Sequence, residues 1–568
     1  DRRFGTPHYA FVAGGHDLYG REKAPLDLPH LLQQVDALKA QVEAFAVSGY
    51  FSPLNPAHEQ EAYEAIRGVC DLPVVLGHQL STKLGSVERA TTAALNASLL
   101  AVLQTLMQAV RRALARRNID APLMVMRGDG TLMSAEFAVA TPVETIHSGP
   151  AASAIGGRFL SGRDEALVID VGGTTTDIAL ITGGAVAVSE EGATVNGFKT
   201  AVQAAKILSI PLGGDSHIHL STDRKLKIGP ERVTPLAYLA AHYPEVDQQL
   251  SSLAKRVRLR PTTDWLEYWF VVSPPDATQK AALTGDEKAL LRYLRAGPQP
   301  LPAILKQLGR LHVGQLDLPT LWQQEMIGKA GLTPTDLLHV EGHYTPWQAA
   351  AAARAIDLFY RFLYRQPEEL HRQVWRHMTE TALRAVVAFL TGRPVPALDD
   401  PREKDQLGAW FFGNSLYQTH PQLESRLRLR LPIIGIGAPA RFVLQGVAEA
   451  LHTELLLPKN HAVANAVGTV AGNVMATAEA LVYPRLSQEG LEVLGYFVQA
   501  GNGRTQFDSL NKALDHASEL TQQQSLTDAR HAGAYNPQVT VQQVANGMDA
   551  YRVQARAIGA PRLGTDKL

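Results

Sequence analysis

The sequence predicts a multidomain α/β protein built around a mainly parallel sheet, and three observations support this fold class. Helix-like and strand-like segments alternate over residues 31–76, which is typical of parallel sheets because successive strands need a crossover helix. Two β-branched, apolar runs flank a glycine-rich turn within residues 167–181. A strand, a glycine turn and a helix follow one another again at residues 431–440.

Length, charge and cysteine content narrow the class of protein. A chain of 568 residues exceeds one hydrophobic core, so roughly two to four domains are expected. With 54 basic and 55 acidic residues, the chain gives no reason to expect nucleic acid or an acidic membrane surface as a partner. Cys70 is the only cysteine, which excludes a disulfide framework. Because no run of about 18 apolar residues occurs, we expect a cytoplasmic protein with no membrane partner.

The N-terminal part reads as helix, strand, helix, strand and one long helix. The two strands are expected at residues 44–51 and 72–76, and the helices that precede them at 31–42 and 56–68. The long helix is expected at 86–117, where apolar residues recur at spacings of three and four. Four arginines near its end favour a solvated last turn over a nucleic-acid patch.

The turn between the two mid-chain strands is shaped for phosphate. Gly172 and Gly173 let backbone N–H groups approach an anion closely, and Thr174 and Thr175 add hydroxyl donors. Asp170 ends the first strand and can hold Mg²⁺ through water, because hard cations prefer oxygen ligands. An ordinary tight hairpin is the alternative, although the turn in this sequence has more hydroxyl and carboxylate side chains than turn geometry requires.

Further polar turns follow predicted strands or helices. One includes Gly213 and Gly214, after a helix expected at 200–207, and another is the Gly435-Ile436-Gly437 turn. Asp129 follows a strand expected at 123–126, where α/β folds place ligand groups, and an ordinary turn is an equal alternative.

Other segments favour structural roles. His217 and His219 share one face of a strand at metal-ligand spacing, but packing is the favoured interpretation. Residues 286–332 fit a helix-turn-helix unit, whose candidate recognition helix at 318–331 contains one basic residue, so a structural insert is favoured over DNA binding. A helix is also expected at 462–480.

Seven motifs occur in one order along the chain, and together they resemble the hydantoinase A/5-oxoprolinase family. The resemblance covers roughly residues 25–480. The motifs are Phe51-Ser52-Pro53-Leu54-Asn55-Pro56-Ala57-His58-Glu59, Glu88-Arg89-Ala90-Thr91-Thr92-Ala93-Ala94-Leu95-Asn96-Ala97, Gly130-Thr131-Leu132-Met133-Ser134-Ala135, Ser148-Gly149-Pro150-Ala151-Ala152, Asp170-Val171-Gly172-Gly173-Thr174-Thr175-Thr176-Asp177, Gly331-Leu332-Thr333-Pro334-Thr335-Asp336 and Ala464-Asn465-Ala466-Val467-Gly468.

This resemblance implies an actin-like (ribonuclease H-like) ATPase fold with two lobes and a mostly helical insert. We expect residues 1–85 to belong to an N-terminal α/β lobe, 86–230 to a phosphate-hairpin lobe and 231–345 to the helical insert. Residues 346–483 would hold a helical segment and the adenosine-side turn, and residues 484–568 are of unassigned type.

The resemblance also implies ATP and Mg²⁺ as cofactors, a B-type second subunit and an oligomer. Members of the family open cyclic amides with ATP, and relatives carboxylate ketones. The expected catalytic residues are Asp170, Asp177 and Asp129, with Asp170 also on the metal. The expected nucleotide-binding residues are Gly172, Gly173, Thr174, Thr175, Gly213, Gly214, Gly435, Gly437 and Ala438.

Departures from the family pattern leave three functions open. The family's first phosphate hairpin has no match before Asp170, and we expect it to lie upstream of Asp1, with a half-built nucleotide site as the alternative. The family's Ser-Asn-Gly-Gly and Gly-Gly-Gly-Ser turns are replaced here by turns that contain Asp129 and Asp215. The candidates are therefore a cyclic-amide hydrolase, a ketone carboxylase subunit and a non-catalytic ATP-binding regulatory or assembly protein.

Overall fold

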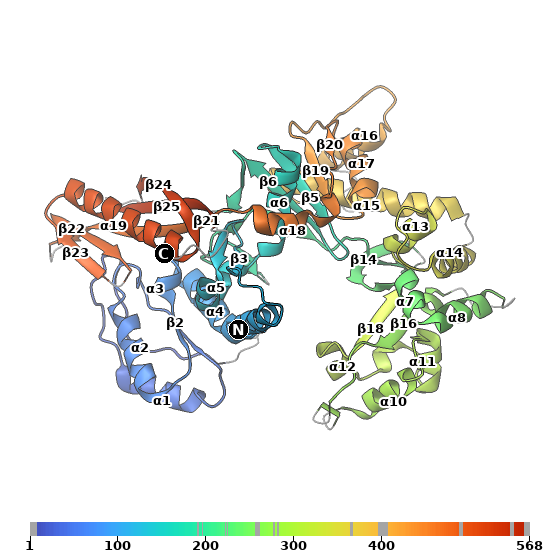
Figure 1. Cartoon of the computed structure of the whole chain (residues 1–568), viewed down its shortest axis with the longest axis horizontal. Helices are drawn as coiled ribbons and strands as arrows, with labels where there is room; N and C mark the ends of the chain where they lie inside the picture. The colour runs from blue at the N-terminus through green and yellow to red at the C-terminus, as the bar shows by residue number, and fades with distance from the viewer. Residues whose placement is uncertain are drawn as a thin grey trace. The chain divides into compact units, whose positions relative to one another are not determined.

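The protein divides into two compact units, each built from separate stretches of chain (Figure 1). Unit one comprises residues 1–164, 179–206 and 464–568, and unit two comprises residues 165–178 and 207–463. The structure is a computed structural model. It describes residues 8–561, apart from 190–191, 196, 222, 224, 256–261, 277–278, 281–282, 364–366, 396–406, 488–491, 502 and 546–549.

A small α/β layer opens unit one, close to the element order predicted for it. Strands β1 and β2 pair in parallel, and the long helix α4 packs against both. A buried pair stabilises the layer: Glu59 Oε2 lies 2.6 Å from His78 Nδ1, and Glu59 also accepts a hydrogen bond from the Gly49 backbone. The elements are α1 (Leu28–Leu38), β1 (Phe45–Val47), α2 (Ala57–Val69), β2 (Val74–Leu76), α3 (Gly77–Leu80) and α4 (Ser86–Arg116).

By length and composition alone, α4 is the one helix in the described part of the chain that could cross a membrane. Of its most apolar stretch, 17% is buried within the structure, and Val102 and Leu106 are exposed. Its first turns are anchored, because Arg89 and Asn96 are buried and bond to backbone carbonyls.

The C-terminal region, whose fold the sequence did not reveal, forms a sheet covered by one long helix (Figure 1). The strand order is β23-β22-β21-β25-β24, and β4, which also pairs with β3, joins β21. Ala513 and Ala517 of α19 pack on Val482 and Val553 of the sheet. The elements are β3 (Met124–Met126), β4 (Leu132–Ser134), β21 (Val474–Leu486), β22 (Val493–Ala500), β23 (Gly503–Phe507), α19 (Leu510–His531), β24 (Ala534–Ala545) and β25 (Tyr551–Pro561).

Two helix predictions in alanine-rich segments are wrong. The helix expected at 462–480 ends at Ala471, and β21 follows, since Ala476, Ala478 and Ala480 alternate with less buried residues and pair with β25. Tertiary pairing here overrides the helix propensity of alanine. The helix expected at 200–207 is replaced by the strands β11 (Ala204–Ala205) and β12 (Ile207–Ile210). The remaining short elements of unit one are α5 (Ala135–Ala140), β7 (Ala185–Val186), β8 (Val188–Ser189), β9 (Thr194–Val195) and β10 (Phe198–Lys199).

Helices α6 (Ser148–Ser161) and α18 (Ala464–Ala471) of unit one touch through glycine. A Cβ atom on Gly156 would collide with the Ala464 carbonyl, and one on Gly468 would collide with the Ala152 carbonyl. Because the two backbones meet directly, only glycine fits at these positions.

A central sheet in the order β12-β6-β5-β19-β20 organises unit two. Strand β19 runs parallel to both β5 and β20, and the β5 core residues Leu167 and Ile169 are fully buried. Helices α15 and α17 pack against each other. The elements are β5 (Ala166–Val171), β6 (Thr176–Thr182, which continues into unit one), α14 (Ala349–Leu363), α15 (Pro367–Thr391), α16 (Leu407–Tyr417), β19 (Ile433–Ile436), α17 (Ala440–Ala450) and β20 (Leu455–Leu456).

The segment expected to be a mostly helical insert has more residues in helices than in strands, and it also contains a small sheet that the sequence does not predict. Its sheet runs in the order β15-β18-β16-β17, with helices that bury Trp269, Leu290 and Leu321 against it. The candidate recognition helix is a short helix, α12, followed by strand β18, because Ile327 and Ala330 bury in the sheet beside β16. The elements are β13 (Ser216–Leu220), β14 (Leu226–Arg232), β15 (Thr234–Pro235), α7 (Leu236–His242), α8 (Pro244–Ala254), β16 (Tyr268–Val271), α10 (Gly285–Leu294), β17 (Gln299–Pro300), α11 (Leu301–Gln307), α12 (Pro319–Gln323), β18 (Ile327–Gly331) and α13 (Pro334–Val340).

The glycine contact between α6 and α18 predicts a stability effect. Gly468→Ala should lower the free energy of unfolding by about 2 kcal/mol or more, because overpacking forces the backbones apart. Gly149→Ala in α6 is the matched control, since nothing lies within 4 Å of its Cβ position. Denaturant unfolding measures both variants, and equal stability of the two would contradict the packing argument.

Candidate functional site

The predicted hairpin between β5 and β6 is present, and its tip is open. The Gly172 N–H donates to the Thr175 carbonyl at 2.9 Å and closes the turn. The Thr176 hydroxyl donates to the Leu212 carbonyl at 2.7 Å, which fixes the start of β6. Gly173 and Thr174 are exposed at the tip.

The structure brings the second predicted glycine turn directly against this hairpin. Gly214 N–H donates to the Gly172 carbonyl at 2.9 Å, and Asp215 N–H donates to the Gly173 carbonyl at 2.7 Å. A Cβ atom on Gly213 would collide with the Gly173 carbonyl. The glycines therefore serve a close approach of two backbones, which is a stronger requirement than loop turning.

The third glycine turn reaches the same sheet edge. Ile436 of β19 pairs with Asp170 of β5 in parallel, so the residues after both strands lie at the carboxyl end of the sheet. Gly437 has a φ of +90°, its Cβ position would collide with the Val171 carbonyl, and it lies 3.0 Å from Asp170 Oδ1. Only glycine satisfies both conditions.

The two neighbours of this turn differ in what they face. Ala438 is exposed at the sheet edge. Gly435 is buried, and its Cβ position lies 2.8 Å from the Leu457 side chain and 3.0 Å from Leu444. Close packing against leucines accounts for Gly435 without a nucleotide.

A buried carboxylate supports the second glycine turn. Asp336 accepts hydrogen bonds from the Leu236 and Ala237 backbones and from the backbone and hydroxyl of Thr333. Burial raises the pKa of Asp336 to about 6, against the lowering effect of these donors. Its neighbour Thr335 donates from both its backbone and its hydroxyl to the Gly214 carbonyl, each at 2.8 Å.

Two aspartates lie beside the hairpin tip. The Thr175 hydroxyl donates to Asp177 Oδ2 at 3.4 Å, which braces the turn from the β6 side. Asp215 Oδ2 lies 2.7 Å from the Cβ position of Gly173. Burial raises the pKa of Asp215, while Arg232 and the Thr335 hydroxyl act in the opposite direction. From the sequence, Asp215 is a departure from the family turn and lies in a turn expected to face phosphates or substrate, with ordinary loop turning as the alternative, but no local pattern predicts its contact with Gly173.

Asp129 belongs to unit one, and its observed contacts are those of a turn. Its Oδ1 accepts from the Thr131 backbone at 2.9 Å and from the Thr131 hydroxyl at 2.6 Å. Gly130 follows with a φ of +87°. The neighbouring Arg127 forms a 2.7 Å ion pair with Glu144. These contacts account for the residues as turn structure, and none of them joins Asp129 to the hairpin.

The histidine pair does not form a metal site within the described residues. The rings of His217 and His219 lie with their centroids 4.9 Å apart and are tilted by 33°, and Glu231 approaches His217 Nδ1 at 3.8 Å. Glu231 also forms an ion pair with Lys329. No group of three or more His, Cys, Asp or Glu residues in this part of the chain has a geometry that could hold a metal ion.

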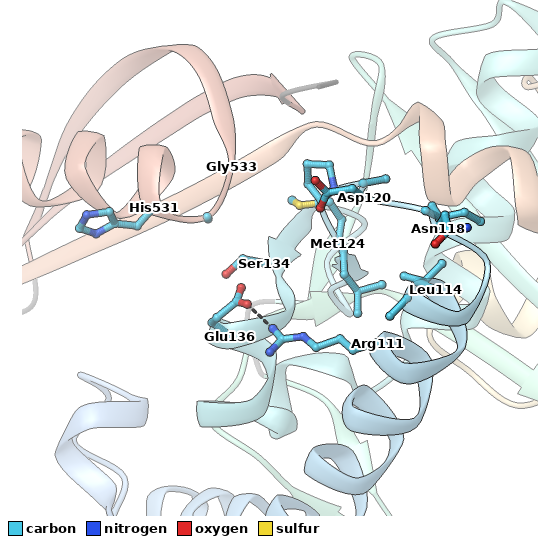
Figure 2. A pocket seen from close by; sticks show the side chains of 15 residues that line it. Arg111, Leu114, Asn118, Asp120, Met124, Ser134, Glu136, His531 and Gly533 are labelled. Atoms are coloured by element: carbon cyan, nitrogen blue, oxygen red, sulfur yellow. Dashed lines mark hydrogen bonds and ion pairs between the residues drawn. The ribbon is translucent and has the colours of Figure 1, made fainter. Parts of the chain in front are cut away.

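A pocket of about 720 Å³ lies in unit one, and none of the residues predicted to bind nucleotide lines it (Figure 2). The end of α4 and the β3–β4 hairpin form its walls, with Gly533 at its rim. Arg111 crosses it to pair with Glu136. Because these two charges neutralise each other, the pocket shows no convergent set of groups for a charged ligand.

Comparison with known proteins finds a family that resembles two segments of the chain. The hydantoinase/oxoprolinase family model matches residues 89–241, and the model of the family's N-terminal region matches residues 6–70. Over these two segments the chain is similar to the hydantoinase/oxoprolinase family.

Curated relatives are subunits of larger assemblies. The chain is 28% identical over 216 residues to the caprolactamase subunit alpha of Pseudomonas jessenii, a match covering 37% of this chain and 31% of the relative. It is 27% identical over 225 residues to the acetophenone carboxylase gamma subunit of Aromatoleum aromaticum, covering 38% and 30%. The matched segment thus spans about a third of each of these hydantoinase/oxoprolinase relatives.

A solved structure defines the fold. The structure of ATP-dependent acetone carboxylase without nucleotide aligns over 96% of this chain and 69% of its own, with a TM-score of 0.57 and 14% sequence identity. This similarity confirms the predicted actin-like ATPase fold. Within that fold, the three glycine turns of unit two meet at one sheet edge.

The contact between the hairpin and the second glycine turn predicts a local effect. Gly213→Ala should separate the two backbones, break both backbone hydrogen bonds and destabilise the protein by about 1–3 kcal/mol. Hydrogen–deuterium exchange of residues 170–176 should accelerate.

Gly285→Ala at the start of α10 is the control, because nothing lies within 4 Å of its Cβ position. Unchanged exchange in the Gly213→Ala hairpin would show that the contact is dispensable.

Proposed function

We propose that the protein is the nucleotide-binding subunit of an ATP-dependent enzyme that opens cyclic amides. The observation that carries this proposal is the meeting of three glycine turns at one sheet edge, with Gly173 and Thr174 exposed between them. A cradle in which a Cβ atom at Gly213 or Gly437 would collide with backbone suits a ligand that approaches backbone N–H groups closely. Polyphosphates bind in this manner.

The hairpin residues fit a nucleotide with its metal. The backbone N–H of Gly173 and the hydroxyls of Thr174 and Thr175 would hold the phosphates, while Gly172 closes the turn that presents them. Asp170, a half-buried carboxylate beside the Gly437 turn, would hold Mg²⁺ through water. Bound ATP supplies a phosphoryl group that converts an amide oxygen into a good leaving group.

The residues of unit two contribute position and charge to this chemistry. An amide is planar and resonance-stabilised, so water attacks it slowly unless its oxygen is activated. Asp177 keeps the Thr175 hydroxyl in place, and the Gly213–Gly214 turn holds the hairpin backbone. Phosphoryl transfer depends mainly on positioning and charge stabilisation, which a rigid turn supplies.

A ketone carboxylase subunit is the second candidate, and the relatives support it equally. The matches include a subunit of a caprolactamase and a subunit of an acetophenone carboxylase. Both names describe multi-subunit enzymes, so we include a B-type partner subunit in either version of the proposal. Regulatory ATP binding without catalysis is a third candidate. The substrate dependence of phosphate release distinguishes it from the two enzymatic functions.

The proposed nucleotide site predicts how removal of the Asp170 carboxylate affects ATP turnover. Asp170→Ala should reduce ATP turnover about 100-fold or more, because the metal loses its anchor, while the melting temperature stays near that of the wild type. Asp223→Ala is the control, since this carboxylate is exposed on the β13–β14 turn. Undiminished ATP turnover in Asp170→Ala would refute the assignment of the hairpin.

Substrate dependence of phosphate release should identify the reaction. A cyclic-amide hydrolase should release phosphate when a lactam, a hydantoin or 5-oxoproline is added to the native protein with its co-purifying subunits. Release that requires bicarbonate and a ketone would identify a carboxylase instead. ATP turnover that responds only to a partner protein would identify a regulatory role.

A further inference from the structure

Asp215 places a carboxylate on the exposed side of the phosphate hairpin. Its Oδ2 atom lies 2.7 Å from the Cβ position of Gly173, so the carboxylate covers the residue at the tip of the turn. The Asp215 backbone is fixed by its hydrogen bond to the Gly173 carbonyl at 2.7 Å. Only 19% of the Asp215 side chain is exposed, which limits its alternative positions.

We infer that Asp215 faces the terminal phosphate of a nucleotide bound at the hairpin and accepts the proton that the attacking group loses. This inference rests on the proposed function. It adds a residue that the hairpin motif does not contain, because Asp215 comes from the second glycine turn.

The proposed reaction requires such a proton acceptor. When the oxygen of a cyclic secondary amide attacks the terminal phosphorus, the new O–P bond forms and the bond from phosphorus to the bridging oxygen breaks. ADP leaves with that electron pair. The amide would become a cation unless its N–H bond breaks, and in this proposal that proton goes to the Asp215 carboxylate. The products of the step are ADP, the neutral phosphorylated amide and protonated Asp215.

The surroundings of Asp215 suit a proton acceptor. The Thr335 hydroxyl from α13 lies 3.3 Å from Oδ1, and the Arg232 guanidinium from β14 lies 3.4 Å from Oδ2. The hairpin presents the backbone of Gly173 on the remaining side. Arg232 is largely exposed and its contact is long, so it orients the carboxylate without neutralising it. Burial also raises the pKa of Asp215, which brings its basicity closer to that needed near neutral pH.

Proton uptake on nucleotide binding tests the position of Asp215 without turnover. A terminal phosphate beside a carboxylate disfavours its ionised form, so binding should draw a proton onto Asp215 at mildly acidic pH. Calorimetric titration in buffers of different ionisation enthalpy measures this uptake. The probes are a non-hydrolysable ATP analogue and ADP, both with Mg²⁺.

Asp215→Asn should remove the extra uptake that distinguishes the ATP analogue from ADP, while both still bind within about threefold of the wild-type affinity. Asp223→Asn, which removes an exposed carboxylate from the adjacent β-turn, should behave as the wild type. Equal uptake in the wild type and Asp215→Asn would overturn this inference alone. A wild-type protein that binds neither nucleotide would overturn the proposed function, and the inference with it.

Kinetics give the second readout. Asp215→Asn should lower kcat for ATP turnover about 100-fold or more with little change in the KM for ATP, as expected for loss of a general base. Because the carboxylate acts in its ionised form and its pKa is raised, wild-type kcat should fall as the pH decreases through that pKa. The variant should lack this acid limb. A parallel loss of nucleotide affinity and kcat, with the acid limb retained, would show that Asp215 only shapes the turn.

Discussion

The contact between two glycine turns is the constraint on which the rest of unit two depends. Gly214 and Asp215 donate backbone hydrogen bonds to Gly172 and Gly173, so main-chain bonds hold the hairpin tip in addition to the side-chain contacts of Thr175 and Thr176. Such a contact permits no Cβ atom at Gly213, and it fixes the hairpin more rigidly than rotamer-dependent contacts could. Gly173 and Thr174 stay exposed at the tip that this backbone contact holds.

A buried carboxylate extends this constraint into the helices. Asp336 accepts hydrogen bonds at the N-termini of both α7 and α13, where backbone N–H groups would otherwise lack partners. Burying a charge is unfavourable unless it is well hydrogen-bonded, and four donors meet that condition here. The result fixes Thr335, which in turn binds the Gly214 carbonyl. Thr335 of α13 thus holds the Gly213–Gly214 turn by hydrogen bonds, and Asp336 holds the start of α13 in the same way.

The sequence predicted local patterns well and long-range contacts poorly. The hairpin was recognisable because two apolar strands flank its polar turn, and the Gly437 turn because it follows a buried strand. The contact of Gly213 with Gly173 joins segments forty positions apart, which no local pattern encodes. For strand β21 the sequence predicts a helix, because alanine favours helices. In the structure the burial of these alanines alternates with a period of two, as in a strand. The packing role of Gly435 likewise depends on side chains from other segments, whereas the turn contacts of Asp129 are local, since its partner Thr131 lies two positions along the chain.

Electrostatics separate the roles of the two carboxylates at the hairpin. Asp170 and Asp215 both bring negative charge to a place proposed for phosphate, and like charges about 4 Å apart oppose each other by about 1 kcal/mol in water and about 4 kcal/mol at a protein surface. A phosphate chain would therefore bind at the hairpin only if this repulsion were compensated. In the proposed site a hydrated Mg²⁺ supplies this compensation at Asp170, whereas Asp215 takes up a proton only at mildly acidic pH and stays ionised near neutral pH, where it acts as the base. The same repulsion that would weaken binding of a free anion raises the basicity of Asp215 at the moment when a proton must leave the substrate.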